Sequence, residues 1–128
     1  MKKLLKFVLI VFVVVVIISS GALFYMTRGL SRGKNLVIND INLTELEDGY
    51  YQGKYEDGRW SNEVEVEINN NKISRVKIID DITFSQPEIK EKIFKRVIEK
   101  QTLDVDIVSE ATVTTKAYLK SIEIALNR

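Results

Sequence analysis

The most pronounced hydrophobic feature of the sequence is an uncharged apolar run from Phe7 to Met26. Its 20 residues would form a helix of about 30 Å, the thickness of the hydrocarbon core of a bilayer. We therefore expect a single transmembrane helix that anchors the chain. A cleaved signal peptide is the alternative, with Phe7–Ile18 as its apolar region and Ser20 and Ala22 before the cleavage site. In both cases the rest of the chain would lie outside the cytoplasm.

Polar and apolar positions further along the chain predict an antiparallel sheet. Tyr50–Tyr55 follows the turn signal Asp48-Gly49 and predicts a first strand, with a bulge or a close approach at Gly53. Glu63–Ile68 alternates strictly, which predicts a second strand with one wet face. Lys72–Ile79 predicts a third strand after a short polar run.

The second and third strands are expected to form a hairpin whose side chains fix its register. A loop of Asn70, Asn71 and Lys72 matches apolar pairs on one face and opposite charges on the other. The matched pairs are Val66 with Val76, Val64 with Ile78, Glu67 with Arg75 and Glu65 with Lys77. A two-residue loop would place Val66 opposite Arg75. We therefore expect a three-residue loop, with an Asn in the left-handed conformation.

Two amphipathic periodicities follow the strands. Ser85-Gln86-Pro87-Glu88 has the spacing of a capping box and predicts a helix over 87–100. A second helix is expected over 113–126. Strands followed by helices indicate an α+β fold, with a small antiparallel sheet and two amphipathic helices after one transmembrane helix. We expect an N-terminal membrane anchor and basic linker over 1–34 and a folded domain over 35–128. The linker, Arg28–Lys34, has no periodicity.

Charge is distributed unevenly between these two regions. Residues 1–34 contain six basic residues and no acidic residue, whereas residues 35–128 contain 13 basic and 18 acidic residues, a net charge of −5. The acidic domain argues against a nucleic-acid partner, and the basic segment favours membrane lipid headgroups. Three basic residues flank each side of the apolar run, so their number does not indicate an orientation. The positive charge of the N-terminal amine then favours a cytoplasmic N-terminus. We expect a single-pass protein of the cell membrane, with a cytoplasmic N-terminus and an extracytoplasmic domain.

The sequence contains neither cysteine nor histidine. Thiolate and imidazole metal ligands, Cys or His nucleophile pairs and histidine proton shuttles are therefore excluded. The acidic pairs Asp80-Asp81 and Asp104/Asp106 lack the ligand number of a calcium loop and are interpreted as solvated turns. No catalytic residue or metal ligand is assigned, and any chemistry must come from hydroxyls, carboxylates, amines or a bound cofactor.

Four hydroxyl side chains gather at the expected start of the last helix, at Ser109, Thr112, Thr114 and Thr115. A helix N-cap needs only one of them and is the explanation that the residues alone favour. An anion site would account for the surplus, because free N–H groups, the helix dipole and hydroxyl donors would converge on a phosphate.

The stretch from Asp106 to Thr114, DIVSEATVT, resembles the D-x-x-S-G-A-T-x-T/S signature of the FMN-binding domain family. That family includes the periplasmic flavin-carrying subunits of sodium-translocating NADH:quinone reductase and of the related ferredoxin-linked electron-transport complex. Upstream, Asp48–Gly53 resembles the D-G-x-Y-x-G opening of the family. The resemblance covers residues 46–127 and implies that FMN is the cofactor of an electron carrier with membrane or extracytoplasmic redox partners.

The resemblance also implies roles for individual residues. Thr112 would accept FMN through its phosphate, as a phosphodiester made by a separate flavin transferase that consumes FAD. Ser109 would line the phosphate site, Asp106 would orient the loop and Thr114 would add a donor in the first helical turn. The full set of implied cofactor-binding residues is Thr112, Ser109, Ala111, Glu110, Thr114 and Asp106.

Glu110 departs from the family pattern, which has Gly at this position. A Gly reaches positive φ without strain, and a carboxylate beside a phosphate costs about 1 kcal/mol in a solvated setting. We still expect covalent attachment, because the helix dipole and several N–H donors could offset the repulsion. The alternative is a flavin-free interaction or sensory module that retains the fold.

Overall fold

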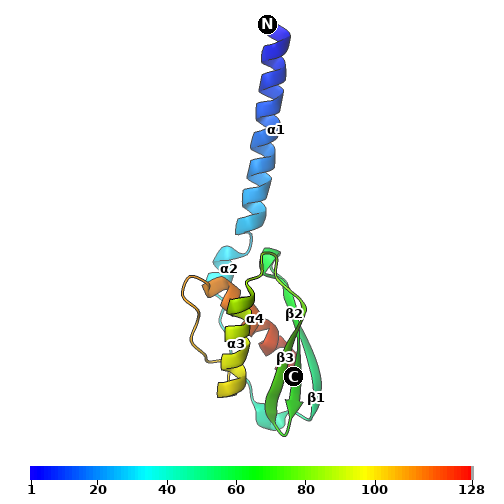
Figure 1. Cartoon of the computed structure of the whole chain (residues 1–128), viewed down its shortest axis with the longest axis vertical. Helices are drawn as coiled ribbons and strands as arrows, with labels where there is room; N and C mark the ends of the chain where they lie inside the picture. Colours follow the sequence, from blue (N-terminus) through cyan, green and yellow to red (C-terminus); the bar gives the residue numbers. More distant parts are fainter. Residues whose placement is uncertain (128) are drawn as a thin grey trace.

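The computed structural model of the protein describes residues 1–127. One long helix, α1 (Lys2–Thr27), rises alone above a two-layer domain (Figure 1). None of its residues is buried against the rest of the described chain, and it is long and apolar enough to cross a membrane. The expected long apolar helix is therefore present, and its place in a membrane stays a prediction.

The segment interpreted as a linker differs from the sequence expectation. Leu30–Lys34 forms a short helix, α2, whose Gly33 is buried. A Cβ at Gly33 would lie 2.4 Å from Cγ1 of Val113, so glycine is what allows this helix to approach the last helix of the domain. Leu30 packs against a small cluster formed by Trp60, Val113 and Ala117. These long-range contacts stabilise a helix for which the local sequence has little propensity.

The sheet has three antiparallel strands in the order β1 (Gly49–Tyr55), β2 (Asn62–Asn69) and β3 (Lys72–Asp80). A 3₁₀ turn, η1 (Leu43–Glu45), precedes β1, and a second, η2 (Gly58–Trp60), links β1 to β2. Side chains of β2 alternate between buried and half-buried, as predicted for a strand with one wet face. The three expected strands are confirmed.

The predicted register of the β2–β3 hairpin is confirmed, but the predicted loop is wrong. Val66 lies opposite Val76 and Glu67 opposite Arg75, as the side-chain pairs require. The loop has only two residues, Asn70 and Asn71, both with positive φ (53° and 60°). This conformation is typical of a two-residue hairpin turn. A bulge opposite Glu67 and Ile68 restores the register by adding one residue to β3.

Both predicted helices are confirmed, as α3 (Pro87–Lys100) and α4 (Thr112–Leu126). The predicted capping box is wrong, since the N-cap of α3 is Gln86 and its side chain makes no capping hydrogen bond. Proline disfavours helical geometry in the residue before it, and Gln86 is accordingly extended, with φ −119° and ψ 101°. The helix therefore begins at Pro87.

The helices cover one face of the sheet, and α4 lies at the centre of the core (Figure 1). Its apolar side is buried, at Tyr118, Leu119, Ile122, Ala125 and Leu126. A Cβ at Gly53 of β1 would lie 2.0 Å from the carbonyl oxygen of Ser121, which confirms the expected close approach at this glycine. The fold is the α+β arrangement that the sequence predicted.

Asp81, interpreted from the sequence as part of a solvated turn, instead joins β3 to both helices. Its Oδ1 accepts a hydrogen bond of 2.6 Å from the Tyr118 hydroxyl of α4, and its Oδ2 accepts one of 2.9 Å from Lys90 Nζ of α3. Burial raises the pKa of Asp81, but these donors, the Ile82 N–H and the charge of Lys90 together bring the pKa below its ordinary value. The carboxylate therefore stays ionised and stabilises the packing of α4.

Candidate anion site at the N-terminus of α4

The start of α4 is shaped by two residues that cannot cap it. Glu110 adopts the left-handed conformation, with φ 66°, and Ala111 occupies the N-cap position. Within residues 1–127, no side chain accepts a hydrogen bond from the N–H groups of the first turn. The N-cap role favoured for the hydroxyl residues is therefore wrong, because the chain turns at Glu110 and places Thr112 at the first helical position. These N–H groups and the positive end of the helix dipole remain directed outward.

A cavity of about 280 Å³ opens at this helix end. Three segments border it: α2, η2 and the first turn of α4 with the two residues before it. The lining residues are Leu30, Lys34, Arg59, Trp60, Glu110, Ala111, Thr112, Val113 and Thr114. Lys34 and Arg59 bring two positive charges to this opening, against the single negative charge of Glu110.

Arg59 is held in place from several sides. Its Nε donates a 3.0 Å hydrogen bond to the carbonyl oxygen of Met26, at the end of α1. Its guanidinium carbon lies 4.2 Å from the centre of the Trp60 ring and 5.7 Å from that of Phe84, within the range of cation–π contacts. Neither Nη1 nor Nη2 hydrogen-bonds to a residue of the described chain. Arg59 thus offers a fixed charge with two nitrogens free to bind an anion.

Lys34 reaches the cavity because α2 packs on α4. The contact of Gly33 with Val113 fixes α2, and Lys116 Nζ of α4 donates a 2.8 Å hydrogen bond to the Lys34 carbonyl oxygen. The Lys34 side chain itself is exposed. An exposed ammonium group contributes a screened charge, weaker than that of the half-buried Arg59.

The structure brings four of the six residues named from the sequence to this cavity, namely Glu110, Ala111, Thr112 and Thr114. Thr112 is exposed and Thr114 is half-buried. Ser109 is exposed in the preceding turn and does not line the cavity. Asp106 is also outside it; the carbonyl oxygen of this residue accepts a 2.7 Å hydrogen bond from Arg96 Nη1.

Sequence reasoning missed the basic residues of the site. Lys34 stood in the segment interpreted as a linker, and Arg59 lies in a short 3₁₀ turn with no periodicity. Trp60 is 2 % exposed and is part of the small cluster beneath the cavity. No local pattern marks these residues, because their approach to Thr112 depends on how α2 and η2 pack against α4.

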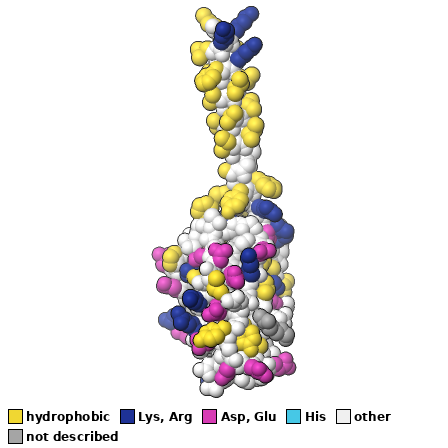
Figure 2. Space-filling view, turned by 90° about the vertical axis from the view of Figure 1, so that its right-hand side faces the viewer, with side chains coloured by type: hydrophobic (Ala, Val, Ile, Leu, Met, Phe, Trp, Pro, Cys, Tyr) yellow, Lys and Arg dark blue, Asp and Glu magenta, His cyan; other side chains and the backbone are white. Residues whose placement is uncertain are grey.

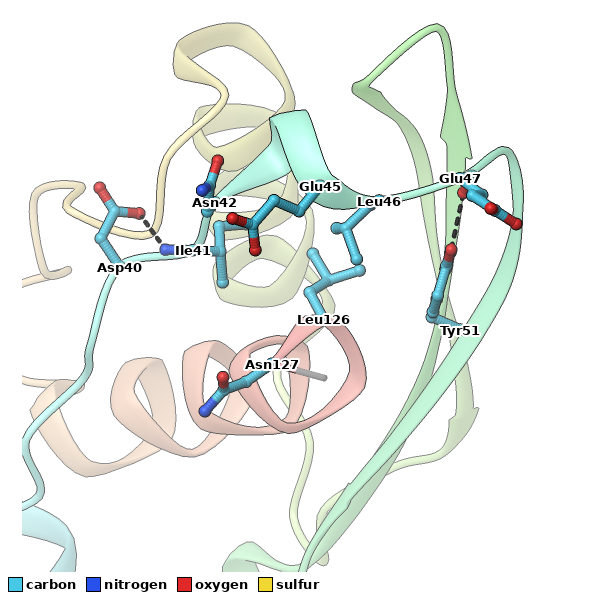
Figure 3. A pocket seen from close by; sticks show the side chains of 9 residues that line it. All are labelled: Asp40, Ile41, Asn42, Glu45, Leu46, Glu47, Tyr51, Leu126 and Asn127. Carbon is cyan, nitrogen blue, oxygen red and sulfur yellow. Dashed lines mark hydrogen bonds between the residues drawn. The ribbon is translucent and has the colours of Figure 1, made fainter.

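A larger cavity, of about 450 Å³, lies at the other end of α4 (Figure 3). Three carboxylates line it, from Asp40, Glu45 and Glu47. Burial raises the pKa of Asp40, but hydrogen bonds from Thr102, Leu103 and Ile41 lower the pKa below its ordinary value and keep the group ionised. Together with the negative end of the helix dipole, these charges disfavour an anion in the larger cavity.

The smaller cavity fits a phosphate group by its chemistry. It combines unpaired helix N–H groups, an arginine, a lysine and threonine hydroxyls, which are common phosphate ligands in proteins. Its volume lies just below the 300–1,000 Å³ of pockets that enclose most of a drug-sized ligand. A larger ligand would therefore seat its phosphate here and extend beyond the opening.

Comparison with known proteins agrees with this chemistry. The family model described as "FMN-binding domain" matches residues 58–127, which include η2, α3, the loop of the expected signature and α4. No curated protein and no solved structure matches the chain. The match spans more than half of the 128 residues and indicates FMN as the cofactor. The chain therefore belongs to the FMN-binding domain family.

Proposed function

We propose that this protein is a membrane-anchored, extracytoplasmic electron carrier whose FMN is joined through its phosphate to Thr112. The observation that carries the proposal is the position of Thr112: an exposed threonine at the first residue of an uncapped helix, in a cavity that also holds Arg59 and Lys34. A phosphodiester at Thr112 keeps one negative charge, which the helix dipole and both cations stabilise.

The basic and hydroxyl residues of the cavity each have a role in this proposal. Arg59 donates from its free Nη1 and Nη2 to the phosphate oxygens, and Lys34 adds a second charge at the rim. The N–H groups of the first turn of α4 donate to the same phosphate, and the Thr114 hydroxyl adds a further donor. Ser109 and Asp106 act indirectly, by shaping the turn that leads to Glu110. This set of donors exceeds what a simple helix cap requires.

Attachment needs an external enzyme, because a threonine hydroxyl is a weak nucleophile and no cysteine or histidine is present to activate it. Thr112 Oγ1 forms a bond to the flavin-side phosphorus of FAD, the bond from that phosphorus to the bridging oxygen breaks, and AMP leaves. The hydroxyl proton passes to a base of the flavin transferase. The exposure of Thr112 gives such an enzyme access to the acceptor oxygen.

The Glu110 carboxylate repels a phosphate in the cavity only weakly. Its side chain is exposed, where water and salt screen its charge, and two basic residues line the same cavity. Its backbone has a φ of 66°, a conformation that glycine adopts without strain, so a glycine would fit the same backbone. Attachment at Thr112 is therefore compatible with Glu110.

The flavin supplies the redox chemistry when it is bound, since its ring accepts electrons and passes them on. The small volume of the cavity leaves the ring at the surface of the domain, within reach of a membrane or extracytoplasmic redox partner. The protein's contribution is to attach and orient the cofactor, which suits a carrier better than an enzyme with a substrate of its own.

We assign α1 as a retained anchor with the N-terminus in the cytoplasm. The last turn of α1 contacts the domain, through the Arg59 hydrogen bond to Met26 and a 3.2 Å hydrogen bond between the Tyr25 and Thr83 hydroxyls. A signal peptidase cut near Ser20 or Ala22 would leave Tyr25 and Met26 on the domain and remove most of the apolar run that precedes them. The short basic N-terminal flank and the long domain favour this orientation.

The test is co-expression of the full chain with a flavin transferase, followed by flavin fluorescence in a denaturing gel. We expect a fluorescent band for the wild type and for Ser109→Ala, and none for Thr112→Ala. Thr112→Ser, which keeps a hydroxyl, should recover part of the signal. A band that persists in Thr112→Ala would contradict the attachment site. A wild-type chain that stays colourless would favour a flavin-free interaction or sensory module.

A further inference from the structure

Phe84 has an unusual conformation for an exposed aromatic residue. Its side chain is 60 % exposed, and its φ of 60° is rare for a bulky residue. The preceding residue is held in place, because the Thr83 N–H donates a 2.9 Å hydrogen bond to the Arg59 carbonyl oxygen. The fold thus holds a strained residue with its ring turned outward, an arrangement that is more frequent at binding sites than elsewhere.

The position of Phe84 relative to α1 is fixed by two contacts. The Thr83 hydroxyl hydrogen-bonds to Tyr25, and Arg59, whose guanidinium lies against the Phe84 ring, binds Met26. Tyr25 and Met26 are the last residues of the apolar run. Phe84 is therefore at the level where the apolar run ends, which is the headgroup region if α1 spans a bilayer. Trp and Tyr are enriched at this depth, and Phe is typical of the apolar face of segments that lie in the membrane interface.

The same end of the domain carries basic side chains. Arg28 and Lys34 are exposed, and Arg32 is exposed while paired at 2.7 Å with the nearly buried Asp57. Hydrophobic side chains continue from the stalk onto the top of the domain, with Lys and Arg side chains beside them (Figure 2). An aromatic residue with neighbouring cations matches the chemistry of an anionic lipid interface.

We propose that the domain makes a second membrane contact through Phe84, which inserts among lipid headgroups beside Arg28, Arg32 and Lys34. This inference rests on the proposed anchoring by α1 and adds to it that the domain is seated on the bilayer. The contact holds the membrane-facing end of the domain, where the cavity with Thr112 opens, at the lipid surface. The partner is the headgroup layer of a membrane that contains anionic phospholipid.

The test uses the full chain in lipid vesicles with one nitroxide label at a time. The sequence has no cysteine, so Phe84→Cys gives a unique labelling position. Tyr50→Cys is the matched control, because Tyr50 is 69 % exposed and lies at the start of β1, the end of this strand far from α1 (Figure 1). Val15→Cys, in the middle of α1, reports on the anchor itself.

Accessibility to a water-soluble paramagnetic reagent is then compared among the three labels. In vesicles of phosphatidylcholine with phosphatidylglycerol, we expect the label at 84 to be several-fold less accessible than that at 50, and the label at 15 to be the least accessible. Equal accessibility at 84 and 50, with 15 protected, would overturn the second contact and leave the anchor intact. An accessible label at 15 would overturn both.

A flavin ring stacked on Phe84 could also protect the label at 84. The measurement is therefore repeated with Thr112→Ala, which lacks attached flavin under the proposed function. Protection that persists without flavin, and that increases when phosphatidylglycerol is added, supports the lipid contact. Protection that appears only in the flavin-loaded chain would overturn it in favour of cofactor stacking.

Discussion

The two ends of α4 each border a cavity, and the cavities differ in size and in charge. The cavity at the C-terminal end is larger, about 450 Å³ against 280 Å³, and three carboxylates line it. The cavity at the N-terminal end has Arg59, Lys34 and hydroxyl groups around unpaired helix N–H groups. Volume alone would select the first cavity, whereas the helix dipole and the side-chain charges select the second for an anion.

The two ends also differ in how the chain holds them. The C-terminal half of α4 is buried in the main core, whereas the N-terminal half packs on the small cluster of Trp60, Val113 and Ala117. Leu30 of α2 also packs against this cluster. The anion site is therefore assembled from segments that meet only after folding. The C-terminal half of α4 contributes to the stability of the domain, whereas its N-terminal end is available to bind a ligand.

The largest expected effect on cofactor binding comes from reversing the charge at the N-terminal end. Arg59→Glu removes charge-assisted hydrogen bonds, each of which contributes about 1.5–3 kcal/mol, so binding should weaken roughly tenfold to a hundredfold or more. FMN affinity is measured by flavin fluorescence titration in the Thr112→Ala background, where binding is non-covalent. Lys92→Glu, an equal charge change at an exposed position of α3, should leave the affinity unchanged. A similar loss in both variants would contradict a local role for Arg59.

A variant of Asp81, which contacts the middle of α4 through Tyr118, separates folding from binding. Asp81→Asn weakens the contacts with Tyr118 and Lys90 and should lower the free energy of unfolding at neutral pH by about 1–3 kcal/mol. The FMN affinity of the folded fraction should stay the same. Thermal unfolding of the full chain in detergent, followed by near-ultraviolet circular dichroism, measures the first effect. A loss of FMN affinity equal to that of Arg59→Glu would show that the site depends on the core end of the fold.

The same residue predicts the direction of the pH dependence. Because folding lowers the pKa of Asp81, its stabilisation is fully present well above the unfolded pKa of about 4 and is lost as the pH falls through the folded pKa. The difference in stability between the wild type and Asp81→Asn should therefore shrink below about pH 4. Tyr118→Phe, which removes the hydroxyl donor, should show a smaller dependence on acid than the wild type. A constant difference down to acidic pH would exclude an ionised Asp81 as the cause.

A smaller effect is expected at Glu110. Glu110→Gly removes a carboxylate from the cavity and relieves the strain of a φ of 66°, so FMN affinity should rise about fivefold, equivalent to about 1 kcal/mol. Glu110→Gln keeps the side-chain length and removes only the charge. If Gln gives the full gain, electrostatics accounts for it; if Gly alone does, backbone strain accounts for it. Unchanged affinity in both variants would contradict the assignment of Glu110 to the phosphate site.

The smallest effect is expected at the C-terminal end of α4. Glu45→Gln removes a carboxylate from the larger cavity and should not change FMN affinity or attachment, because that cavity lies a full helix length from Thr112. Flavin content per chain, read from absorbance, checks this. A marked gain in flavin content would show that the larger cavity competes for the cofactor.

Local patterns predicted the elements of the fold but not all of their connections. The pairing of Val66 with Val76 and of Glu67 with Arg75 determined the hairpin register, because both faces of the sheet had to match. The loop length was wrong because a bulge in β3 can add a residue without changing those pairs. The start of α3 at Pro87 was predicted correctly, but the capping box was not, because proline keeps the residue before it extended and Gln86 takes the N-cap position.

The sequence predicted only some of the residues of the candidate site. The residues from Glu110 to Thr114 follow one another along the chain, so the surplus of hydroxyls could suggest an anion there. Arg59 and Lys34 come from segments distant in sequence, and Gly33 brings α2 to α4 through a contact with Val113 that no periodicity reveals. The packing of these segments is tertiary information, which a local pattern does not contain.

Peptide mapping by mass spectrometry tests the central claim most directly. The full chain is co-expressed with a flavin transferase, purified from membranes and digested, and the peptide that carries the flavin phosphate is sequenced. We predict a single modification on Thr112. Flavin attached to any other residue, or a digest in which Thr112 is unmodified while a transferase-treated homologue of known attachment is modified, would contradict the account.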